Sequence, residues 1–230
     1  MHKLTRFVAL CSVLVLVASA IVATQQIVSP GVHPISGRRY ALTMSYLGAD
    51  WLDRSERVQE EEPDAALDAI TLTPGSVVAD VGAGSGYMTV RMARRVGPAG
   101  KVYANDIQPQ MLTILRQRLE REKVANVELV LGTMDDPKLP ANTLDLILMV
   151  DVYHEFAEPQ PMLRKMRDSL KTGGRLVLLE YRKEDPSIPI RPDHKMSVAE
   201  AKMEVEAEGF ILSRVDGRLP RQHILVFTKN

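Results

Sequence analysis

The stretch Asp80-Val81-Gly82-Ala83-Gly84-Ser85-Gly86 is a glycine-rich loop that directly follows the short apolar segment Val77-Val78-Ala79. The residues after the loop, to about Val96, carry a helical pattern, so the loop joins a predicted strand to a predicted helix. Such loops bind polar or anionic ligands through backbone N–H groups and the positive end of the helix, and glycine permits close approach and positive φ. The stretch therefore predicts a site for a nucleotide-like ligand.

Strands and helices continue to alternate along the rest of the chain. Further strands are predicted at residues 102–104, 127–131, 144–150, 175–180, 210–215 and 223–227. Helices are predicted at residues 63–70, 109–119, 161–170 (stopped by Gly173-Gly174) and 197–208 (with Ser197 and Glu200 as a capping box). The last two strands have no helix between them, so they are expected to pair antiparallel. The pattern predicts an α/β fold with a doubly wound, Rossmann-like, mostly parallel sheet and helices on both faces.

The N-terminal residues resemble a targeting segment. Lys3 and Arg6 precede the uncharged, mostly apolar run 7–23, and Ala18-Ser19-Ala20 fits an A-x-A cleavage signature. The run also approaches the ~17–25 residues of a membrane-spanning helix, so a cleaved signal peptide and a retained anchor both stay open. Either would make the domain exported, periplasmic or membrane-anchored, with membrane contact through residues 7–23 in the anchored form. A misassigned start on a cytosolic protein is the remaining alternative. The predicted organisation is 1–24 signal peptide or anchor, 25–62 linker and N-terminal cap, and 63–230 the α/β domain.

Charge and cysteine content exclude several classes of function. The chain has 29 basic and 29 acidic residues, and removing Lys3 and Arg6 leaves 29 − 2 = 27 basic residues in the body. A nucleic-acid binder is expected to have a net basic body or a basic stripe, so no nucleic-acid partner is predicted. The single cysteine, Cys11, lies in the N-terminal segment, which excludes a disulfide framework or cysteine nucleophile in the body.

The spacing of the loop and its acidic neighbours indicate which ligand it binds. A dinucleotide loop has G-x-G-x-x-G spacing, whereas here the third glycine comes one residue early and Tyr87 occupies the expected position. Asp80 precedes the loop, Asp106 follows the second strand, and Asp135-Asp136 follow the third. Carboxylates at this edge of the sheet suit a cationic nucleoside without phosphate, and S-adenosylmethionine (SAM) is such a molecule.

Four segments at these spacings resemble motifs of the class I SAM-dependent methyltransferase superfamily, and within it the type 11 small-molecule enzymes that include ubiquinone/menaquinone C-methyltransferases. The segments are 80–86, 106–112, 144–150 and 170–176, and the resemblance covers about residues 60–230. It implies a seven-stranded sheet whose last strand is antiparallel, with Asp80 and the glycines at the methionine of SAM, Asp106 at the ribose, and Met134 with Asp135 at the adenine. The full set of expected SAM-site residues is Asp80, Gly82, Ala83, Gly84, Gly86, Asp106, Ile107, Met134, Asp135 and Asp151.

The methyl acceptor is expected to bind near the ends of the fourth and fifth strands. His154 and Glu155 are the acid/base candidates, because a histidine titrates near neutrality, although a purely structural or SAM-holding role for His154 stays open. Tyr153, Glu180 and His194 are candidate substrate contacts.

Two alternatives are a metal site at these residues and a different function for the whole protein. His154, Glu155, Glu180 and His194 have the residue types of metal ligands, but no tight pair such as H-x-x-x-H is present, so no metal is predicted. The functional prediction is methyl transfer to a small molecule. The alternative is a SAM-binding protein of this fold that transfers no methyl group.

Overall fold

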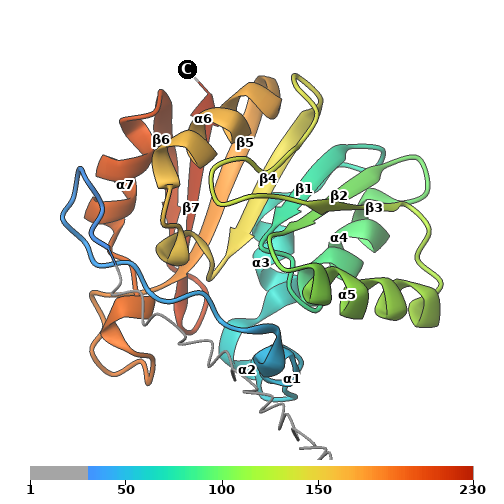
Figure 1. Ribbon diagram of the computed structural model, residues 1–230, viewed down its shortest axis with the longest axis horizontal. Coiled ribbons are helices and arrows are strands. Elements are labelled where there is room, and N and C mark those ends of the chain that lie inside the picture. The colour runs from blue at the N-terminus through green and yellow to red at the C-terminus, as the bar shows by residue number, and fades with distance from the viewer. Residues whose placement is uncertain (1–30, 230) are drawn as a thin grey trace, which may run out of the picture.

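A single seven-stranded sheet forms the centre of the computed structural model, which describes residues 31–229. Its strands run in the order β3-β2-β1-β4-β5-β7-β6 (Figure 1). Their bounds are β1 Val77–Val81, β2 Lys101–Asp106, β3 Val127–Leu131, β4 Leu144–Val150, β5 Leu170–Tyr181, β6 Phe210–Asp216 and β7 Gln222–Lys229. Strands β1 to β5 pair in parallel, whereas β7 is antiparallel to both of its neighbours, β5 and β6. The predicted fold, including the antiparallel final strand, is confirmed.

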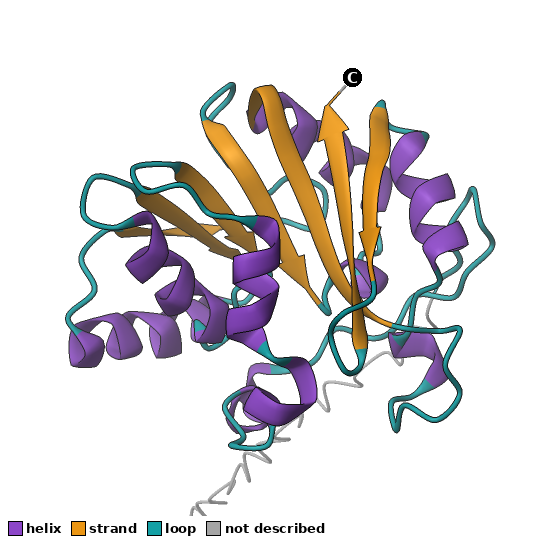
Figure 2. Cartoon of the chain, turned by 180° about the vertical axis from the view of Figure 1, so that it is seen from behind, coloured by secondary structure: helices purple, strands orange, loops and turns teal. Residues whose placement is uncertain are grey.

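Helices cover both faces of this sheet (Figure 2). They are α1 Ala49–Leu52, α2 Arg57–Glu61, α3 Pro63–Ile70, α4 Tyr87–Val96, α5 Pro109–Glu122, α6 Pro159–Ser169 and α7 Val198–Glu206, with 3₁₀ turns η1 Tyr46–Gly48, η2 Tyr153–Glu155 and η3 Pro192–His194. Alternation of side chains along β4 shows why both faces are covered. Leu146 and Leu148 pack with α3 and α4, whereas Ile147 and Met149 pack with α6 and α7.

Sequence patterns located most elements closely. Helix α5 buries Met111, Leu112, Leu115 and Leu119, which is the apolar stripe expected from the sequence. The capping box of α7 is present, with the Ser197 side chain accepting from the Glu200 N–H and the Glu200 carboxylate accepting from the Ser197 N–H.

The end of α6 differs from the prediction. Helix α6 ends at Ser169 and β5 begins at Leu170, so Gly173-Gly174 lies inside the strand rather than after the helix. The pairing of β4 with β5 shifts register between Leu144 and Leu146, and β5 accommodates its extra residues at the two glycines. A Cβ at Gly174 would lie 3.0 Å from the Leu144 carbonyl oxygen, so glycine allows this close approach of the two strands.

The N-terminal region of the described chain is an ordered arm rather than a loose linker. Residues 31–45 run along the edge of the domain from α7 towards α1 and α2 (Figure 1), and Tyr40 and Ala41 are buried. The predicted signal peptide or anchor, 1–24, lies outside the described residues, as does the start of the predicted linker. Within residues 31–229, no helix is long and apolar enough to cross a membrane.

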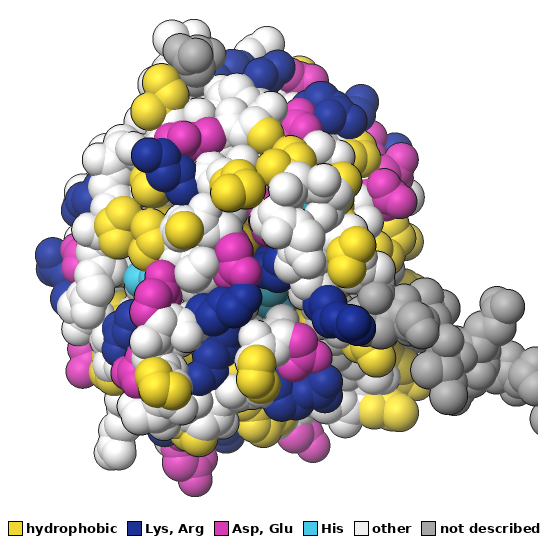
Figure 3. Space-filling model, turned by 90° about the vertical axis from the view of Figure 1, so that its left-hand side faces the viewer, with side chains coloured by type: hydrophobic (Ala, Val, Ile, Leu, Met, Phe, Trp, Pro, Cys, Tyr) yellow, Lys and Arg dark blue, Asp and Glu magenta, His cyan; other side chains and the backbone are white. Residues whose placement is uncertain are grey.

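The side of the domain on the left of Figure 1 carries charges of both signs. Lys and Arg side chains lie next to Asp and Glu side chains on this face, with hydrophobic groups between them (Figure 3). The described residues include exposed ion pairs, such as Lys183 with Glu200 and Arg191 with Asp193. This face therefore does not present a uniform basic surface.

Candidate active site

A cavity of about 550 Å³ opens at the carboxyl ends of β1, β2 and β4. This is the edge at which open α/β sheets bind ligands, and the volume is in the range of small-molecule sites. Residues from the glycine loop, the β2 end, η2, η3 and the N-terminal arm share its wall. The lining residues include Leu42, Met44, Trp51, Leu52, Arg57, Gly82, Gly84, Asp106, Ile107, Gln108, Thr133, Met134, Asp151, His154, Glu155, Phe156, Met162, Ile190 and His194.

The glycine loop contributes Gly82 and Gly84 to the cavity wall. Both adopt positive φ, at 75° and 53°. A Cβ at Gly82 would lie 2.4 Å from Val152 Cγ2, and a Cβ at Gly84 would lie 2.7 Å from Leu52 Cδ1. Glycine is therefore required at both positions, because the loop packs closely against η2 on one side and the cap on the other.

Two other loop residues that were expected in the SAM site face away from the cavity. Ala83 is buried in a cluster with Leu115 of α5. A Cβ at Gly86 would lie 2.0 Å from Leu115 Cδ1, so this glycine allows the loop to pack on α5. In this structure, Ala83 and Gly86 support the shape of the loop and do not line its ligand side.

Asp80 also lies beneath the loop rather than in the cavity wall. Its carboxylate accepts a hydrogen bond of 2.5 Å from the Thr89 hydroxyl of α4. Burial raises the pKa of Asp80 to about 6. Because α4 covers this side chain, the structure does not show it at the cavity surface. Direct contact between Asp80 and the methionine of SAM therefore stays a prediction.

Asp106 occupies the position expected of a ribose-binding carboxylate. It lines the cavity and accepts hydrogen bonds from the backbone N–H groups of Gly84, at 3.0 Å, and Gln108, at 2.8 Å. Burial raises the pKa of Asp106, although these backbone donors oppose the shift. An ionised carboxylate has about four acceptor sites, so two backbone bonds leave room for ribose hydroxyls.

Ile107 and Met134 line the same part of the cavity, but Asp135 does not. Asp135 is exposed and accepts a hydrogen bond of 2.7 Å from the Thr133 hydroxyl. Thr133 itself lines the cavity, so the β3 end contributes Thr133 and Met134 to the wall in place of the predicted carboxylate.

Gln108 is a site residue that the sequence patterns missed. Its side chain accepts from the Tyr46 N–H at 2.9 Å and donates to the Met44 carbonyl at 2.9 Å. These two bonds fasten the arm across the ligand-binding edge of the sheet. A glutamine before Pro109 has no distinctive motif, and its partners lie more than sixty positions away.

Asp151 and Arg57 are two ionisable groups that line the cavity near the glycine loop. Asp151 has a positive φ of 50°, and its Oδ2 accepts from the Gln222 side chain at 2.6 Å. Its Oδ1 is buried without a hydrogen-bond partner among the described residues. Burial, followed by the charges of Glu61 and Glu180, raises the pKa of Asp151 well above its usual value. An unpaired carboxylate oxygen here is suited to a cationic ligand group.

Arg57 was also missed, because it lies in the region predicted as linker and cap. It is 6% exposed, and its guanidinium donates to Glu61 at 2.6 Å and to the Leu52 carbonyl at 2.9 Å. The guanidinium also lies over the Tyr87 ring, at 4.3 Å from its centroid. A buried cation in the cavity wall can bind the carboxylate of an amino-acid moiety.

His154 and His194 form the polar end of the cavity together with Glu155. The Nδ1 of His154 lies 2.6 Å from Glu180 Oε2, and its Nε2 lies 3.1 Å from His194 Nδ1. Burial is the largest single influence and lowers the pKa of His154, but the charge and hydrogen bond of Glu180, together with the charge of Glu155, raise it above its usual value. Burial, and then the neighbouring His154, lower the pKa of His194. The structure brings these candidate residues together, although Glu180 contacts His154 rather than the cavity. Their roles in catalysis and substrate binding stay predictions.

Glu155 points into the cavity, and its Oε1 accepts from the Met44 N–H at 3.3 Å. Burial raises the pKa of Glu155 to about 7. A carboxyl group of this kind can exchange a proton near neutral pH.

Tyr153 does not contact the cavity. Its side chain is fully buried in the core cluster of α6 and α7, and its ring packs edge-on against Phe156 at 5.6 Å. The prediction of Tyr153 as a substrate contact is therefore not met in this structure. Residue 153 opens a 3₁₀ turn that directs its side chain to the core and those of His154 and Glu155 to the cavity, which a sequence pattern does not reveal.

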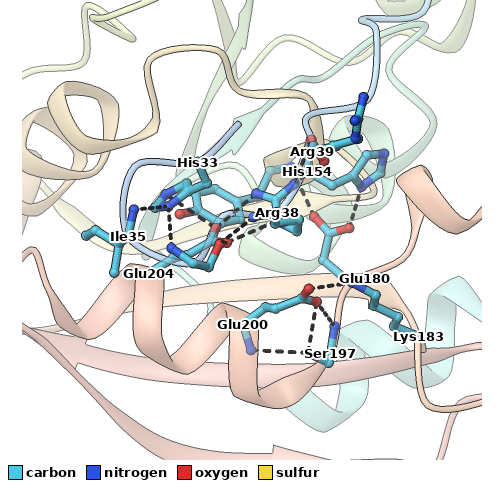
Figure 4. Close-up of polar contacts among 12 residues, drawn as sticks. His33, Ile35, Arg38, Arg39, His154, Glu180, Lys183, Ser197, Glu200 and Glu204 are labelled. Carbon is cyan, nitrogen blue, oxygen red and sulfur yellow. Dashed lines mark hydrogen bonds and ion pairs between the residues drawn. The ribbon is translucent and has the colours of Figure 1, made fainter. Parts of the chain in front are cut away.

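The N-terminal arm holds the backbone of His154 in place (Figure 4). Arg38 donates to both carboxylate oxygens of Glu204 on α7, at 3.0 and 2.9 Å, and to the His154 carbonyl, at 3.0 Å. The same carbonyl accepts from the Ala41 N–H at 3.1 Å. Because Arg38 and Glu204 are buried, this pairing ties the arm, α7 and η2 into one unit.

Comparison with known proteins agrees with this geometry. A family model described as "Methyltransferase domain" matches residues 72–215. The ubiquinone/menaquinone biosynthesis C-methyltransferase UbiE of Escherichia fergusonii is 36% identical over 118 residues, which cover 51% of this chain and 47% of that protein. The chain thus spans about half the length of the curated relatives it matches.

Solved structures show the same architecture. A SAM-dependent methyltransferase from Aquifex aeolicus has a TM-score of 0.75 and 27% identity, covering 80% of this chain and 98% of that one. A putative type 11 methyltransferase from Sulfolobus solfataricus has a TM-score of 0.61 and 22% identity, covering 74% and 94%, and it supports the fold alone. The chain therefore belongs to the methyltransferase domain family.

Proposed function

We propose that this protein transfers the methyl group of SAM to a small acceptor with a largely apolar body, whose reacting atom lies against His154 and Glu155. One observation carries this proposal: a single cavity extends from the glycine loop to the His154–His194 pair. Donor and acceptor bound at its two ends would meet in one enclosure. Enclosure and alignment account for a large part of the rate of such a displacement.

In this proposal the nucleoside of SAM lies along the β2 and β3 ends. The Asp106 carboxylate accepts from the ribose hydroxyls, and the adenine lies between Ile107 and Met134. The methionine group extends past Gly82 and Gly84. Its carboxylate pairs with Arg57, which is a buried cation in the wall, and its ammonium donates to Asp151 Oδ1, which has no hydrogen-bond partner among the described residues.

The acceptor occupies the remaining part of the cavity. Its wall there includes Leu42, Phe156, Met162 and Ile190, which suit an apolar molecule. The curated relatives act, by their names, in ubiquinone/menaquinone biosynthesis. A ring with an apolar substituent is the acceptor class that this lining supports best.

The reaction is one displacement. The acceptor atom attacks the methyl carbon, the bond from that carbon to sulfur breaks, and S-adenosylhomocysteine leaves. The proton that the acceptor loses is released at the polar end of the cavity. His154 and Glu155 are the titratable groups there that can take part in its transfer.

The test is methyl transfer from isotopically labelled SAM to a panel of ring compounds with and without apolar substituents. Transfer to the apolar members, lost in His154→Ala while SAM binding is kept, would support the proposal. SAM binding without transfer to any acceptor would favour the alternative of a SAM-binding protein with another role.

Association with a membrane is part of the proposal. Residues 7–23 are uncharged and mostly apolar, and Leu42, Leu47 and Trp51 near the cavity are 56%, 79% and 48% exposed. An apolar acceptor could enter such a mouth from a lipid surface. Fractionation of epitope-tagged protein, with and without residues 1–24, tests this: the complete chain should sediment with membranes, and recovery in the soluble cytosol would contradict it.

A further inference from the structure

Three side chains with metal-ligand chemistry converge at the acceptor end of the cavity. His154 and Glu155 lie in η2, and His194 lies in η3, forty residues further along the chain. One ligand atom from each of the three lies within 4.8 Å of the others. All three line the cavity, so a group bound between them would face the acceptor.

The distance between the two imidazole nitrogens suits a shared metal ion. With metal–nitrogen bonds of about 2.0–2.1 Å, two ligands lie about 2.9 Å apart at a right angle and about 3.4 Å apart at a tetrahedral angle. His154 Nε2 and His194 Nδ1 are 3.1 Å apart, between these limits. An ion bound by both nitrogens replaces the proton that joins them in this hydrogen bond, and their separation already matches that of two ligands of one ion. Glu155 supplies the third ligand, with a carboxylate oxygen within 4.8 Å of both nitrogens.

The surroundings of His154 are those of a metal-binding histidine. Glu180 is fully buried, and its Oε2 lies 2.6 Å from His154 Nδ1, so that nitrogen donates its proton to the carboxylate. The lone pair of Nε2 then faces His194. A carboxylate behind the ligating imidazole fixes the ring and its tautomer in many metal sites. Glu180 also accepts from the Tyr153 N–H at 3.0 Å, which holds it outside the ligand set.

The charges around the cluster also favour a cation. Glu155 and Glu180 supply two carboxylates, and Asp193 adjoins His194. Arg191, which directly precedes η3, is paired with Asp193 at 2.6 Å, and Arg38 is paired with Glu204. Two imidazoles and one carboxylate are a ligand set for divalent first-row transition metals, whereas Mg²⁺ prefers oxygen ligands alone.

We infer that His154, His194 and Glu155 bind one divalent first-row transition-metal ion at the acceptor end of the cavity. Three protein ligands leave a coordination position open towards the cavity, where an oxygen or nitrogen atom of the acceptor binds. The ion lowers the pKa of a bound hydroxyl group and so eases its deprotonation. This role rests on the proposed methyl transfer, and in the metal-bound form the ion takes the place of direct proton transfer by His154 and Glu155. Metal binding itself does not rest on that proposal. The sequence predicted no metal because the two histidines are forty positions apart and meet only through the fold.

The test is a titration of chelator-treated, dialysed full-length protein with Co²⁺, followed by its visible absorption, with Zn²⁺ as competitor. The wild type should bind one ion. His194→Ala and Glu155→Gln should bind at least about tenfold more weakly, since each loses one ligand. Glu158→Gln is the matched control: it makes the same chemical change three residues away, at an exposed position, and should bind like the wild type.

Calorimetry with SAM on the same samples separates this inference from the proposed function. Unchanged SAM binding in the variants shows that they are folded. Absence of Co²⁺ binding by the wild type, or equal affinity in His194→Ala, would overturn the metal site and leave the SAM site standing. Methyl transfer at an undiminished rate in metal-free protein would overturn the role of the ion in the reaction.

Discussion

The two ends of the cavity are built in different ways. The SAM end consists of backbone and side chains at the ends of adjacent parallel strands, with Gly82, Gly84 and Asp106 each placed by a local turn. The acceptor end joins His154, His194 and the N-terminal arm, which come from separate parts of the chain. Ligand binding by a loop leaves a spacing pattern in the sequence, whereas a cluster of distant side chains leaves none.

Among variants that change only one end of the cavity, His154→Ala is expected to have the largest effect. Methyl transfer should fall by about 10²–10⁴-fold, because the variant removes the polar group at the acceptor while the SAM end is intact. SAM affinity, measured by calorimetry, should stay near that of the wild type. A parallel loss of SAM affinity would show that the two ends are not independent.

The second expected effect concerns the arm that supports the acceptor end. Arg38→Met leaves the buried Glu204 carboxylate without its arginine partner, with only the Ser36 hydroxyl and the His33 ring beside it, which costs about 3–5 kcal/mol of the free energy of unfolding. Chemical denaturation measures this loss. The double variant Arg38→Met/Glu204→Leu should recover part of it, because no unpaired charge then stays buried. If the double variant is no more stable than the single one, the loss comes from packing rather than from the charge.

The third prediction concerns Asp80, beneath the SAM end. The pKa of Asp80 is about 6 in the folded chain and 3.8 ordinarily, so the folded protein binds its proton more tightly than the unfolded chain. Its contribution to stability is therefore greatest below pH ~4 and falls as the pH rises towards ~6, by up to roughly 3 kcal/mol. Asp80→Asn should remove this dependence. Denaturation of both proteins between about pH 4 and 7 tests it, and parallel profiles would contradict the raised pKa.

The smallest expected effect is on SAM affinity, and it distinguishes Asp106 from Asp135, the two carboxylates that the sequence assigned to the nucleoside of SAM. Asp106→Asn should weaken SAM binding by roughly 10–100-fold, through loss of charged hydrogen bonds to the ribose. Asp135→Asn should leave it nearly unchanged, because Asp135 is exposed and outside the cavity wall. Calorimetric titration of the two variants compares them. Equal weakening would restore the sequence-based assignment of Asp135 to the adenine.

Most of the fold could be predicted from the sequence because local patterns determine its elements. The apolar run 144–150 became β4 without change, and Pro109 and the apolar stripe defined α5. The start of β5 could not be predicted. Its two glycines suggested a loop, whereas pairing with β4 extends the strand through them.

The candidate site could be predicted only in part. Gly82, Gly84, Asp106 and Asp151 line the cavity as expected, since they follow strands that end at one edge. Arg57 and Gln108 could not be found, because their roles depend on how the arm and cap fold back over that edge. Tyr153 was misplaced because the direction of a side chain within a 3₁₀ turn is set by tertiary packing.

Titration of SAM into three proteins tests the two-ended cavity most directly: the wild type, Gly82→Ala and His154→Ala. One SAM should bind per wild-type chain, and His154→Ala should bind SAM with unchanged affinity. Gly82→Ala should lose binding, because its Cβ would lie 2.4 Å from Val152 and the positive φ of 75° would be strained. Absence of SAM binding by the wild type, or equal binding by Gly82→Ala, would contradict the two-ended cavity.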